Sequence, residues 1–242
     1  GFVAGVNAAR KLRGQSPFIL DRSQGYIGVL IDDLVTKGTN EPYRMMTSRT
    51  EYRLLHRQDN ADQRLCPLGH AIGLVSDERY QRVLEKYETV ARECRRLEHS
   101  GAAASAELNA LLEARGEPPV KNSVRLADLL RRPRLNYAYL ATVDPDRPDL
   151  PREVTEQVEI SLKYEGYIAR QQRQVEEMRR LEGRSLPADL DYNALAGLRL
   201  EARQKLTAIR PLNLGQASRI SGVSPADIAA LMIYLERKGK EA

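Results

Sequence analysis

The stretch from Ser76 to Ser100 limits the possible folds of this chain most strongly. Apolar side chains recur there every three or four residues, with Glu and Arg at most other positions. This spacing aligns them along one side of a helix, and Ser76 and Gly101 supply its start and stop signals. The aligned residues are Tyr80, Val83, Leu84, Tyr87, Ala91, Cys94 and Leu97. We therefore expect a long amphipathic helix whose apolar side other elements must cover.

The composition agrees with a fold built mainly from helices. Of the 242 residues, 42% are hydrophobic and 29% are charged, and the chain has no Trp and only 2 Phe. Leu, Ala, Glu and Arg are prominent, and all four favour helices. We therefore expect a mainly α protein, with a multi-helix domain over residues 23–183 and a small terminal three-helix subdomain over residues 187–242. At most a short strand is expected near the N-terminus, at Phe18–Leu20.

Further helices are expected where start and stop signals bracket an apolar period. Ser48–Glu51 has the pattern of a capping box, in which two side chains each satisfy an amide at a helix start, so a short helix to about Arg57 should follow. Pro151 opens the longest candidate helix, which extends to about Leu181. The other expected helices cover residues 1–12, 23–37, 59–73, 102–115 and a Ser123-capped stretch to residue 130, and the last helix of the chain is capped by Ser224.

The charge pattern permits a polyanionic partner without demanding one. Lys and Arg number 38 and Asp and Glu 33, so the formal net charge is +5. Arg outnumbers Lys, and a guanidinium can grip a phosphate through two parallel hydrogen bonds. No apolar run approaches the roughly twenty residues of a membrane helix. We expect a soluble, cytoplasmic protein without a secretory leader.

No set of side chains in the sequence indicates catalysis or metal binding. Cys66 and Cys94 stand alone, without a CxxC spacing or a nearby His, which favours two reduced thiols over a disulfide or a zinc site. The histidines His56, His70 and His99 are scattered and have no plausible Ser or Cys partner. Glycine motifs that bind phosphates or dinucleotides are also missing. We therefore assign no catalytic, cofactor-binding or metal-ligating residue.

An arginine-rich stretch between residues 41 and 65 is the first candidate binding site. Arg49, Arg53 and Arg57 are four residues apart, and on a helix each such step turns the side chain by only about 40°. They would form one ridge of guanidinium groups, with Tyr43 and Tyr52 nearby as faces on which a base could stack. Alternatively, these arginines pair inside the protein with the acids of the same stretch, which are Glu51, Asp59 and Asp62.

A second candidate site lies on the predicted long helix. The residues that would share one face are Lys163, Tyr167, Arg170 and Gln174. Gly166 sits beside them, and a Gly in a helix interior costs about 1 kcal/mol relative to Ala, so we expect another group to approach the helix closely there. That group is either the backbone of a neighbouring helix or a nucleic-acid backbone. Tyr164 and Tyr167 would be either core-edge residues or platforms for stacked bases.

Residues 215–225 form a third candidate, with a small helix, a tight turn at Gly222 and then the helix capped by Ser224. Helix-turn-helix DNA-binding proteins share this outline. An antiparallel helix pair in any compact bundle shares it too, and the last helix has mostly small or apolar residues where a DNA reader needs polar ones. A helix-turn-helix DNA-binding protein using residues 215–237 remains the alternative function.

Three segments, taken in this order, resemble the GidA/MnmG family. They are EPYRMMTSRTEYRLL with the following DNAD at residues 41–62, KYEGYI at residues 163–168 and GQASRISGV at residues 215–223. Residues 1–10 are also similar to the last helix of the family's flavin-binding domain, so residues 1–22 would be the tail of that domain. The resemblance spans essentially the whole chain and implies a piece of a longer protein.

The resemblance implies a role in tRNA modification. Members of this family bind FAD, use NADH and a methylene-tetrahydrofolate carbon donor, and form homodimers. With a GTPase partner, MnmE, they add a carboxymethylaminomethyl group at carbon 5 of the tRNA wobble uridine. The flavin-binding and catalytic residues of the family precede the part represented here. The resemblance therefore implies a chain that binds partners, without a cofactor of its own and without catalysing the reaction alone.

The resemblance also assigns roles to residues. In the family this helical region is implicated in tRNA binding, and its end in docking the GTPase. The first role maps to Arg44, Arg49, Arg53, Arg57, Arg64, Lys163 and Arg170. The second maps to residues 187–242, with Arg219, Ile228, Leu231 and Leu235 as docking residues. A structural or docking piece whose arginines are all paired internally is the remaining alternative.

Overall fold

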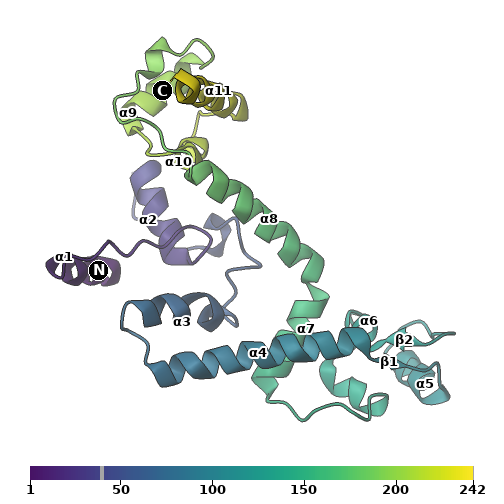
Figure 1. Ribbon diagram of the computed structural model, residues 1–242. Helices are drawn as coiled ribbons and strands as arrows, with labels where there is room; N and C mark the ends of the chain where they lie inside the picture. The colour runs from purple at the N-terminus through teal and green to yellow at the C-terminus, as the bar shows by residue number, and fades with distance from the viewer. Residues whose placement is uncertain (39–40, 242) are drawn as a thin grey trace. The chain divides into compact units, whose positions relative to one another are not determined.

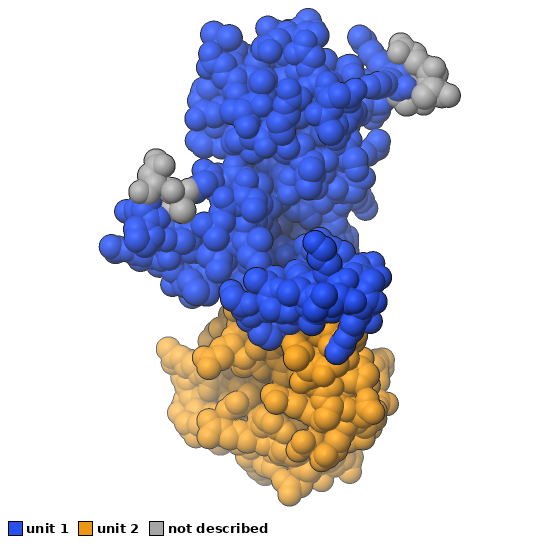
Figure 2. Space-filling model, turned by 90° about the vertical axis from the view of Figure 1, so that its left-hand side faces the viewer, with its two compact units in different colours: residues 1–53, 170–242 blue, residues 54–169 orange. Residues whose placement is uncertain are grey.

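A computed structural model describes residues 1–38 and 41–241, and it confirms a mainly α protein (Figure 1). The chain divides into two compact units (Figure 2). Unit 1 comprises Gly1–Arg53 and Arg170–Ala242, and unit 2 comprises Leu54–Ala169. None of the described helices is both long enough and apolar enough to cross a membrane.

Unit 2 is built around the predicted amphipathic helix, α4 (Asp77–His99). Ser76 caps this helix, because its hydroxyl accepts a hydrogen bond from the amide of Arg79 at 3.3 Å. Helix α7 (Arg152–Lys163) packs along α4, as Figure 1 shows. The remaining elements of the unit are α3 (Ala61–Ala71), β1 (Gly101–Ala102), α5 (Ala106–Ala114), β2 (Val124–Arg125), α6 (Leu126–Leu130) and the 3-10 helix Tyr137–Thr142. Strands β1 and β2 pair antiparallel and form the one sheet among the described residues.

The apolar side of α4 is partly as predicted, since Leu97 is buried but Leu84 and Ala91 are exposed. Leu84, expected inside, is 43% exposed, whereas Val90 and Glu93 are buried. Glu93 can be buried because it accepts a hydrogen bond from the Tyr137 hydroxyl at 2.8 Å and pairs with Arg96 at 2.8 Å. A charged residue with two partners thus occupies a position that an apolar pattern would not identify.

Unit 1 contains the helices from the two ends of the chain. They are α1 (Phe2–Leu12), α2 (Tyr26–Thr36), most of α8 (Glu165–Glu182), α9 (Leu200–Ile209), α10 (Leu214–Arg219) and α11 (Pro225–Glu241), with 3-10 helices at Thr47–Arg49 and Tyr192–Ala194. Helices α9 to α11 confirm the three helices expected within residues 187–242. The tight turn between α10 and α11 is also confirmed, since Gly222 has a φ of 94°.

The apolar core of unit 1 lies in the C-terminal bundle. The buried residues of this core are Leu186, Leu190, Tyr192, Leu198, Ala202, Leu206, Leu214, Ala217, Ile220, Ile228 and Leu231. By contrast, α1 has no buried residue. Apolar burial therefore stabilises the bundle directly, and the N-terminal segment of unit 1 depends on other contacts.

The expected strand at Phe18–Leu20 does not form. The carboxamide of Asn7 donates to the carbonyl of Phe18 at 3.0 Å and accepts from the amide of Phe18 at 2.6 Å. Both backbone groups of Phe18 therefore find partners without a neighbouring strand. The segment is extended but belongs to no sheet.

The expected helix from Ser48 to Arg57 is wrong. A 3-10 turn at Thr47–Arg49 is followed by turns as far as α3. The Arg57 guanidinium donates to the carbonyl of Leu54 at 2.6 Å, and the Asn60 side chain donates to the carbonyl of Leu55 at 3.1 Å. These side chains occupy carbonyls that a continuing helix would use, which is how polar side chains compete with helix formation.

The predicted helix from Pro151 to Leu181 is interrupted at Tyr164, which has φ −107° and ψ 10° and separates α7 from α8. Gly166 therefore lies in the first turn of α8. A Cβ added at Gly166 would meet no described protein atom within 4 Å. The expectation that a neighbouring helix approaches Gly166 is therefore wrong for the described residues. A Gly at a helix start costs less than one in the interior, so it needs no close neighbour to explain it.

The expected Ser123 cap is also wrong. Ser123 donates its hydroxyl to the carbonyl of Ala102 at 3.1 Å, so it serves the sheet, and α6 begins at Leu126 after Arg125.

We predict that the C-terminal bundle is sensitive to changes at its buried positions. Leu206 is fully buried, whereas Leu200, on the same helix α9, is 70% exposed. Leu206→Ala should lower the free energy of unfolding by about 2–5 kcal/mol, because it removes buried methyl groups and leaves a cavity. Leu200→Ala should change it by no more than about 0.5 kcal/mol. Denaturant unfolding followed by circular dichroism measures both, and similar losses would contradict the assigned core.

Helices α3 and α4 of unit 2 are joined by Asp62. Its carboxylate pairs with Lys86 at 2.8 Å and accepts from the Tyr87 hydroxyl at 2.7 Å. Burial alone would raise the pKa of Asp62, but the hydrogen bonds from Lys86 and Tyr87 outweigh it and hold the pKa below its ordinary value. The charged form is therefore favoured by folding.

A lowered folded-state pKa gives stability that is present above the ordinary pKa of Asp, about 4, and is lost as the pH falls through the folded-state value. Asp62→Asn should therefore lower the free energy of unfolding at pH 7 by about 1–3 kcal/mol, with a difference that shrinks as the pH falls below about 4. Exposed Asp146 lies in the same unit, and Asp146→Asn is the matched control. Unfolding measured from pH 7 to pH 3 checks the expectation, and a pH-independent difference would refute it.

Candidate nucleic-acid interface

The arginines predicted to bind RNA do not form a ridge, but three of them lie on one exposed segment of unit 1. We call residues 43–53 the arginine loop. Arg44, Arg49 and Arg53 are exposed on it. Within residues 1–38 and 41–241, none of these three forms an ion pair with a carboxylate. The loop therefore presents three positive charges that the described part of the protein does not neutralise.

Tyr43 and Arg49 stack on each other at the start of the arginine loop. The Arg49 guanidinium lies 4.3 Å from the centre of the Tyr43 ring. The Tyr43 hydroxyl donates to Asp33 at 2.9 Å, and burial together with this bond raises the pKa of Tyr43. Stacking uses the flat face of the guanidinium and leaves its N–H edge available for an anion.

Arg57 and Arg64, which belong to unit 2, have structural roles. Arg57 pairs with Asp59 at 3.1 Å, and Arg64 donates to Asn60 at 3.1 Å and to the carbonyl of Arg57 at 3.0 Å. Burial, and then the nearby positive charge of Arg57, lower the pKa of Arg64. Internal pairing, the alternative considered for these arginines, thus holds for Arg57. The partners of Glu51 and Asp62 are Arg22 and Lys86.

The candidates from the second sequence motif also divide into a residue with partners inside unit 2 and residues on the surface. Lys163 donates to the carbonyl of Leu135 and lies 4.0 Å from Glu159 within unit 2. Tyr164 and Tyr167 are 46% and 62% exposed, so they are surface residues. Arg170, in unit 1, is exposed and forms no ion pair within the described part of the chain.

Helix α8 packs against the arginine loop within unit 1. The Gln171 side chain donates to the carbonyl of Glu51 at 3.2 Å. Val175, one helical turn further on, is buried on the same face of the helix. Arg170 and Arg173, on either side of Gln171, are exposed. The loop and this part of α8 therefore bring exposed arginines from two distant segments into one region.

A buried charge network supports this region, and its central residue is Arg22. The Arg22 side chain is 3% exposed and contacts Asp33 at 2.7 Å, Asp32 at 2.9 Å and Glu51 at 2.8 Å. Burial alone would lower the pKa of Arg22, but the bonds and charges of Asp33 and Glu51 outweigh it and raise that pKa. The guanidinium is thus fixed in its charged form.

Arg219, predicted as a docking residue, belongs to the same network. Its side chain is 7% exposed and contacts Asp32 at 2.8 Å and Glu182 at 2.9 Å. It therefore joins α10 to α2 and α8. Ile228 and Leu231 are buried, and Leu235 packs against the same core. These four residues therefore make contacts within unit 1, and Leu235 is only partly buried.

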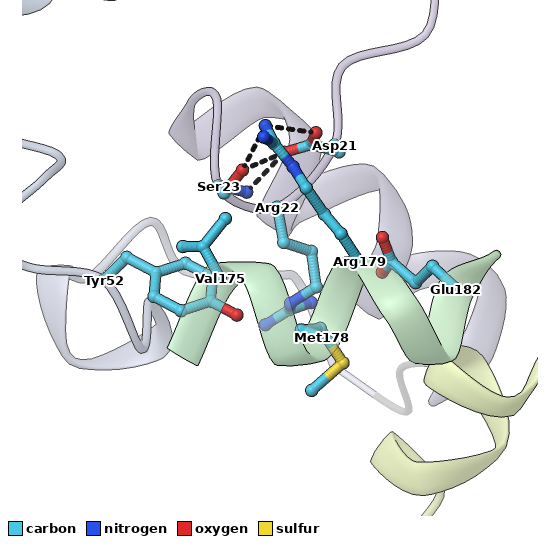
Figure 3. A pocket seen from close by; sticks show the side chains of 8 residues that line it. All are labelled: Asp21, Arg22, Ser23, Tyr52, Val175, Met178, Arg179 and Glu182. Atoms are coloured by element: carbon cyan, nitrogen blue, oxygen red, sulfur yellow. Dashed lines mark hydrogen bonds and ion pairs between the residues drawn. The ribbon is translucent and has the colours of Figure 1, made fainter. Parts of the chain in front are cut away.

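A small pocket lies beside this network (Figure 3). Arg22 and Arg179 line it, but so do Asp21 and Glu182. Arg179 already pairs with Asp21 at 3.2 Å. Because carboxylates face the pocket together with the guanidinium groups, it offers no preference for an anion. The described residues also contain no group of three or more His, Cys, Asp or Glu side chains arranged to hold a metal ion.

The helix pair α10 and α11 does not have the surface of a DNA reader. At the start of α11 the exposed residues are Pro225, Ala226 and Ala229, which carry no side-chain donor or acceptor. Asp227 is buried and pairs with Arg199 at 2.8 Å. Its carboxylate also accepts a hydrogen bond from the amide of Ser224 at 2.8 Å, at the start of α11. A recognition helix reads bases with polar side chains at these positions.

The anchoring residues Arg22, Asp32 and Asp33 were missed by the sequence analysis. A signal for two of them exists. Asp32 and Asp33 interrupt the apolar run of α2, between Ile31 and Leu34. Adjacent carboxylates on a helix with an otherwise apolar face need buried partners, so this pattern indicates a cation elsewhere in the chain. It does not identify which cation.

Family models match most of the chain. Residues 77–172 match the tRNA modifying enzyme MnmG/GidA C-terminal helical domain, and residues 174–242 match the tRNA modifying enzyme MnmG/GidA C-terminal helical bundle.

Known proteins agree with these matches. A Lachnoclostridium phytofermentans protein named tRNA uridine 5-carboxymethylaminomethyl modification enzyme MnmG is 58% identical over 98% of this chain, and the Caldicellulosiruptor saccharolyticus protein of the same name is 55% identical over 99%. The chain spans 38% of the length of each. Aquifex aeolicus GidA in its form II crystal superposes with a TM-score of 0.77 and 39% identity, over 96% of this chain and 36% of that one. The chain belongs to the MnmG/GidA family of tRNA modifying enzymes and corresponds to the C-terminal helical part of that family.

Proposed function

We propose that this chain is the tRNA-binding and partner-docking region of an enzyme that adds a carboxymethylaminomethyl group at carbon 5 of the tRNA wobble uridine. The relatives carry the name of that activity. The observation that carries the binding role is the arginine loop, where Arg44, Arg49 and Arg53 are exposed without carboxylate partners among the described residues. Such groups suit the phosphates of an RNA strand.

The RNA-binding surface of unit 1 would combine the arginine loop with Arg170. Arg49 keeps its N–H edge free while it stacks on Tyr43. In this proposal Arg57, Arg64 and Lys163 make no phosphate contact, because their donors already serve carbonyls and side chains of unit 2. Exposed Tyr164 and Tyr167 of unit 2 remain available for stacking on unpaired bases.

Catalysis would belong to the part of the longer protein that this chain does not represent. We propose that FAD and NADH bind there, and that the longer protein acts in the cytoplasm as a homodimer. The chain spans 38% of its curated relatives, and its cysteines are poor nucleophiles: Cys66 is buried, and burial followed by the charge of Glu93 raises the pKa of Cys94 to about 11.

The docking role is proposed for the outer surface of the C-terminal bundle. Leu200 and Leu212 are each 70% exposed and Ile233 is 53% exposed. They are the proposed candidates for contact with the GTPase MnmE. They take the place of Arg219, Ile228, Leu231 and Leu235, which are engaged inside the unit. Exposed apolar side chains on a bundle with a complete core are suited to a protein partner.

We predict that the arginine loop determines how strongly tRNA binding depends on salt. Each phosphate contact releases counterions, so the logarithm of affinity falls linearly with the logarithm of the salt concentration. In the full-length protein, changing Arg44, Arg49 and Arg53 together to Ala should reduce the magnitude of that slope by about 2–3, at roughly 0.7–0.9 per contact. Filter binding between about 50 and 200 mM salt measures the slope.

A triple variant with the same change of net charge controls for long-range electrostatics. Exposed Arg184, Lys205 and Arg237 lie in the C-terminal bundle. Changing them together to Ala should leave the slope close to that of the wild type, because they make no phosphate contact in this proposal. Equal slopes for the wild type and the loop variant would refute the loop as the binding surface.

We predict that exposed leucines of the bundle contribute to binding of the GTPase. Changing Leu200 and Leu212 together to Ser should weaken binding to MnmE at least about tenfold, since each loses apolar area at an interface, while tRNA affinity is retained. The matched control changes exposed Leu74 and Leu84 of unit 2 to Ser. Calorimetric titration of the full-length variants with MnmE measures the effect. Equal affinities for both double variants would assign docking to another surface.

A further inference from the structure

We propose that Arg22 and Asp33 are positioning residues that form a clamp holding the stretch of the arginine loop between Tyr43 and Glu51 at its two ends. This inference rests on the proposed tRNA-binding function. Neither residue would touch RNA. Their role would be to fix the backbone from which Arg44 and Arg49 reach the phosphates.

The first end of the loop is held by Asp33. The Tyr43 hydroxyl donates to Oδ2 of Asp33 at 2.9 Å, while Oδ1 of Asp33 accepts from Arg22 at 2.7 Å. Lys37 also donates to Oδ1 at 2.8 Å. Burial would raise the pKa of Asp33, but the bonds from Lys37, Arg22 and Tyr43 hold it below its ordinary value. A fully ionised, buried carboxylate thus binds the residue that begins the loop.

The second end of the loop is held by Arg22. Nη2 of Arg22 donates to both oxygens of Glu51, at 2.8 and 3.0 Å. Nη1 of the same guanidinium donates to Asp33. The chain therefore closes on itself from Tyr43 through Asp33 and Arg22 to Glu51. Residues 44–50 lie between the two anchored positions.

Between Tyr43 and Glu51, the described contacts that order the loop are mostly polar. The side chains of residues 44–49 are all exposed, including Met45 at 64% and Met46 at 48%. The Tyr26 hydroxyl also donates to the carbonyl of Met46, and Thr50 is buried. Because residues 44–49 bury no apolar side chain, their order depends on polar contacts.

The clamp itself is rigidly placed. A Cβ on Gly28 would lie 2.3 Å from the carbonyl oxygen of Asp21, so only a glycine allows the segment before Arg22 to lie this close to α2. Asp32 contacts Arg22 at 2.9 Å and Arg219 at 2.8 Å. The Arg22 side chain is 3% exposed. Its guanidinium is therefore held by burial and by ion pairs to carboxylates.

Holding the loop in place would strengthen binding without adding a contact. Ordering a flexible segment costs free energy at the moment of binding, and a segment that is already ordered avoids most of that cost. Release of the clamp should thus weaken affinity for tRNA while the number of phosphate contacts, and with it the salt slope, stays the same. Loss of an arginine that contacts a phosphate should change both the affinity for tRNA and the salt slope.

The test releases the loop without removing an arginine. Tyr43→Phe keeps the ring that stacks on Arg49 but removes the hydroxyl bonded to Asp33, and Glu51→Gln removes the carboxylate bound by Arg22. Glu51 is 48% exposed, so the change is compatible with folding. The control is Tyr87→Phe with Glu165→Gln, which removes a tyrosine–aspartate hydrogen bond and an arginine–glutamate pair in unit 2 with the same change of charge.

In the full-length protein, the Tyr43→Phe, Glu51→Gln variant should bind tRNA about three- to tenfold more weakly than the control variant, with an unchanged salt slope. Amide hydrogen exchange in residues 44–50 should be faster than in the control. Affinity equal to that of the control, or a weaker affinity with a flatter slope, overturns the clamp. If wild-type protein binds no tRNA, the proposed function fails, and hydrogen exchange alone then decides whether the clamp orders the loop.

Discussion

Unit 1 depends on one constraint, which is that a buried guanidinium must be matched by carboxylates. Arg22 and Arg219 have side chains 3% and 7% exposed, and both contact Asp32. Among the described residues of the N-terminal segment, the buried apolar side chains are Val29 and Tyr52. So little apolar burial cannot order this segment. Its position within the unit follows from the need to neutralise the two arginines, since leaving either one unpaired would cost several kcal/mol.

The same network explains why the loop arginines are unpaired. Two acids that anchor the loop are already bound: Glu51 by Arg22, and Asp33 by Arg22, Lys37 and Tyr43. Ionic pairing that anchors the loop also withdraws the carboxylates that would otherwise neutralise Arg44 and Arg49. The same ion pairs therefore support the loop and leave its arginines without carboxylate partners. A change at Glu51 or Asp33 should affect both properties.

The sequence was sufficient to predict elements whose determinants are local. Helix α4 combines a capping Ser76 with a sustained apolar period, and the start of α11 after Ser224 follows from similar signals. Local determinants also explain the failure at residues 50–57, where the Arg57 side chain takes a helical carbonyl. The capping-box pattern contained no information about that competitor.

The candidate site was harder to predict because exposure depends on distant partners. Arg22 and Glu51 are 29 residues apart, and Arg219 and Asp32 are 187 residues apart. A run of arginines indicates potential binding groups, but which of them remain available is decided by carboxylates that only the folded chain brings near. Arg219 shows this most clearly, because its sequence context is that of a surface helix and its side chain is nearly fully buried.

Arginines that support unit 2 differ from those of the loop in their partners, and this difference agrees with the proposed anionic ligand for the loop. In unit 2, Arg96 contacts both Glu93 and Asp144, and Arg131 contacts Glu98, Asp128 and Glu165. Arginines that stabilise this fold are thus surrounded by acids. Three arginines placed on one loop without such partners repel one another, and only Arg49 gains a stacking contact, with Tyr43, among the described residues. An arrangement that costs stability in the free protein is expected where an anion supplies the missing charge.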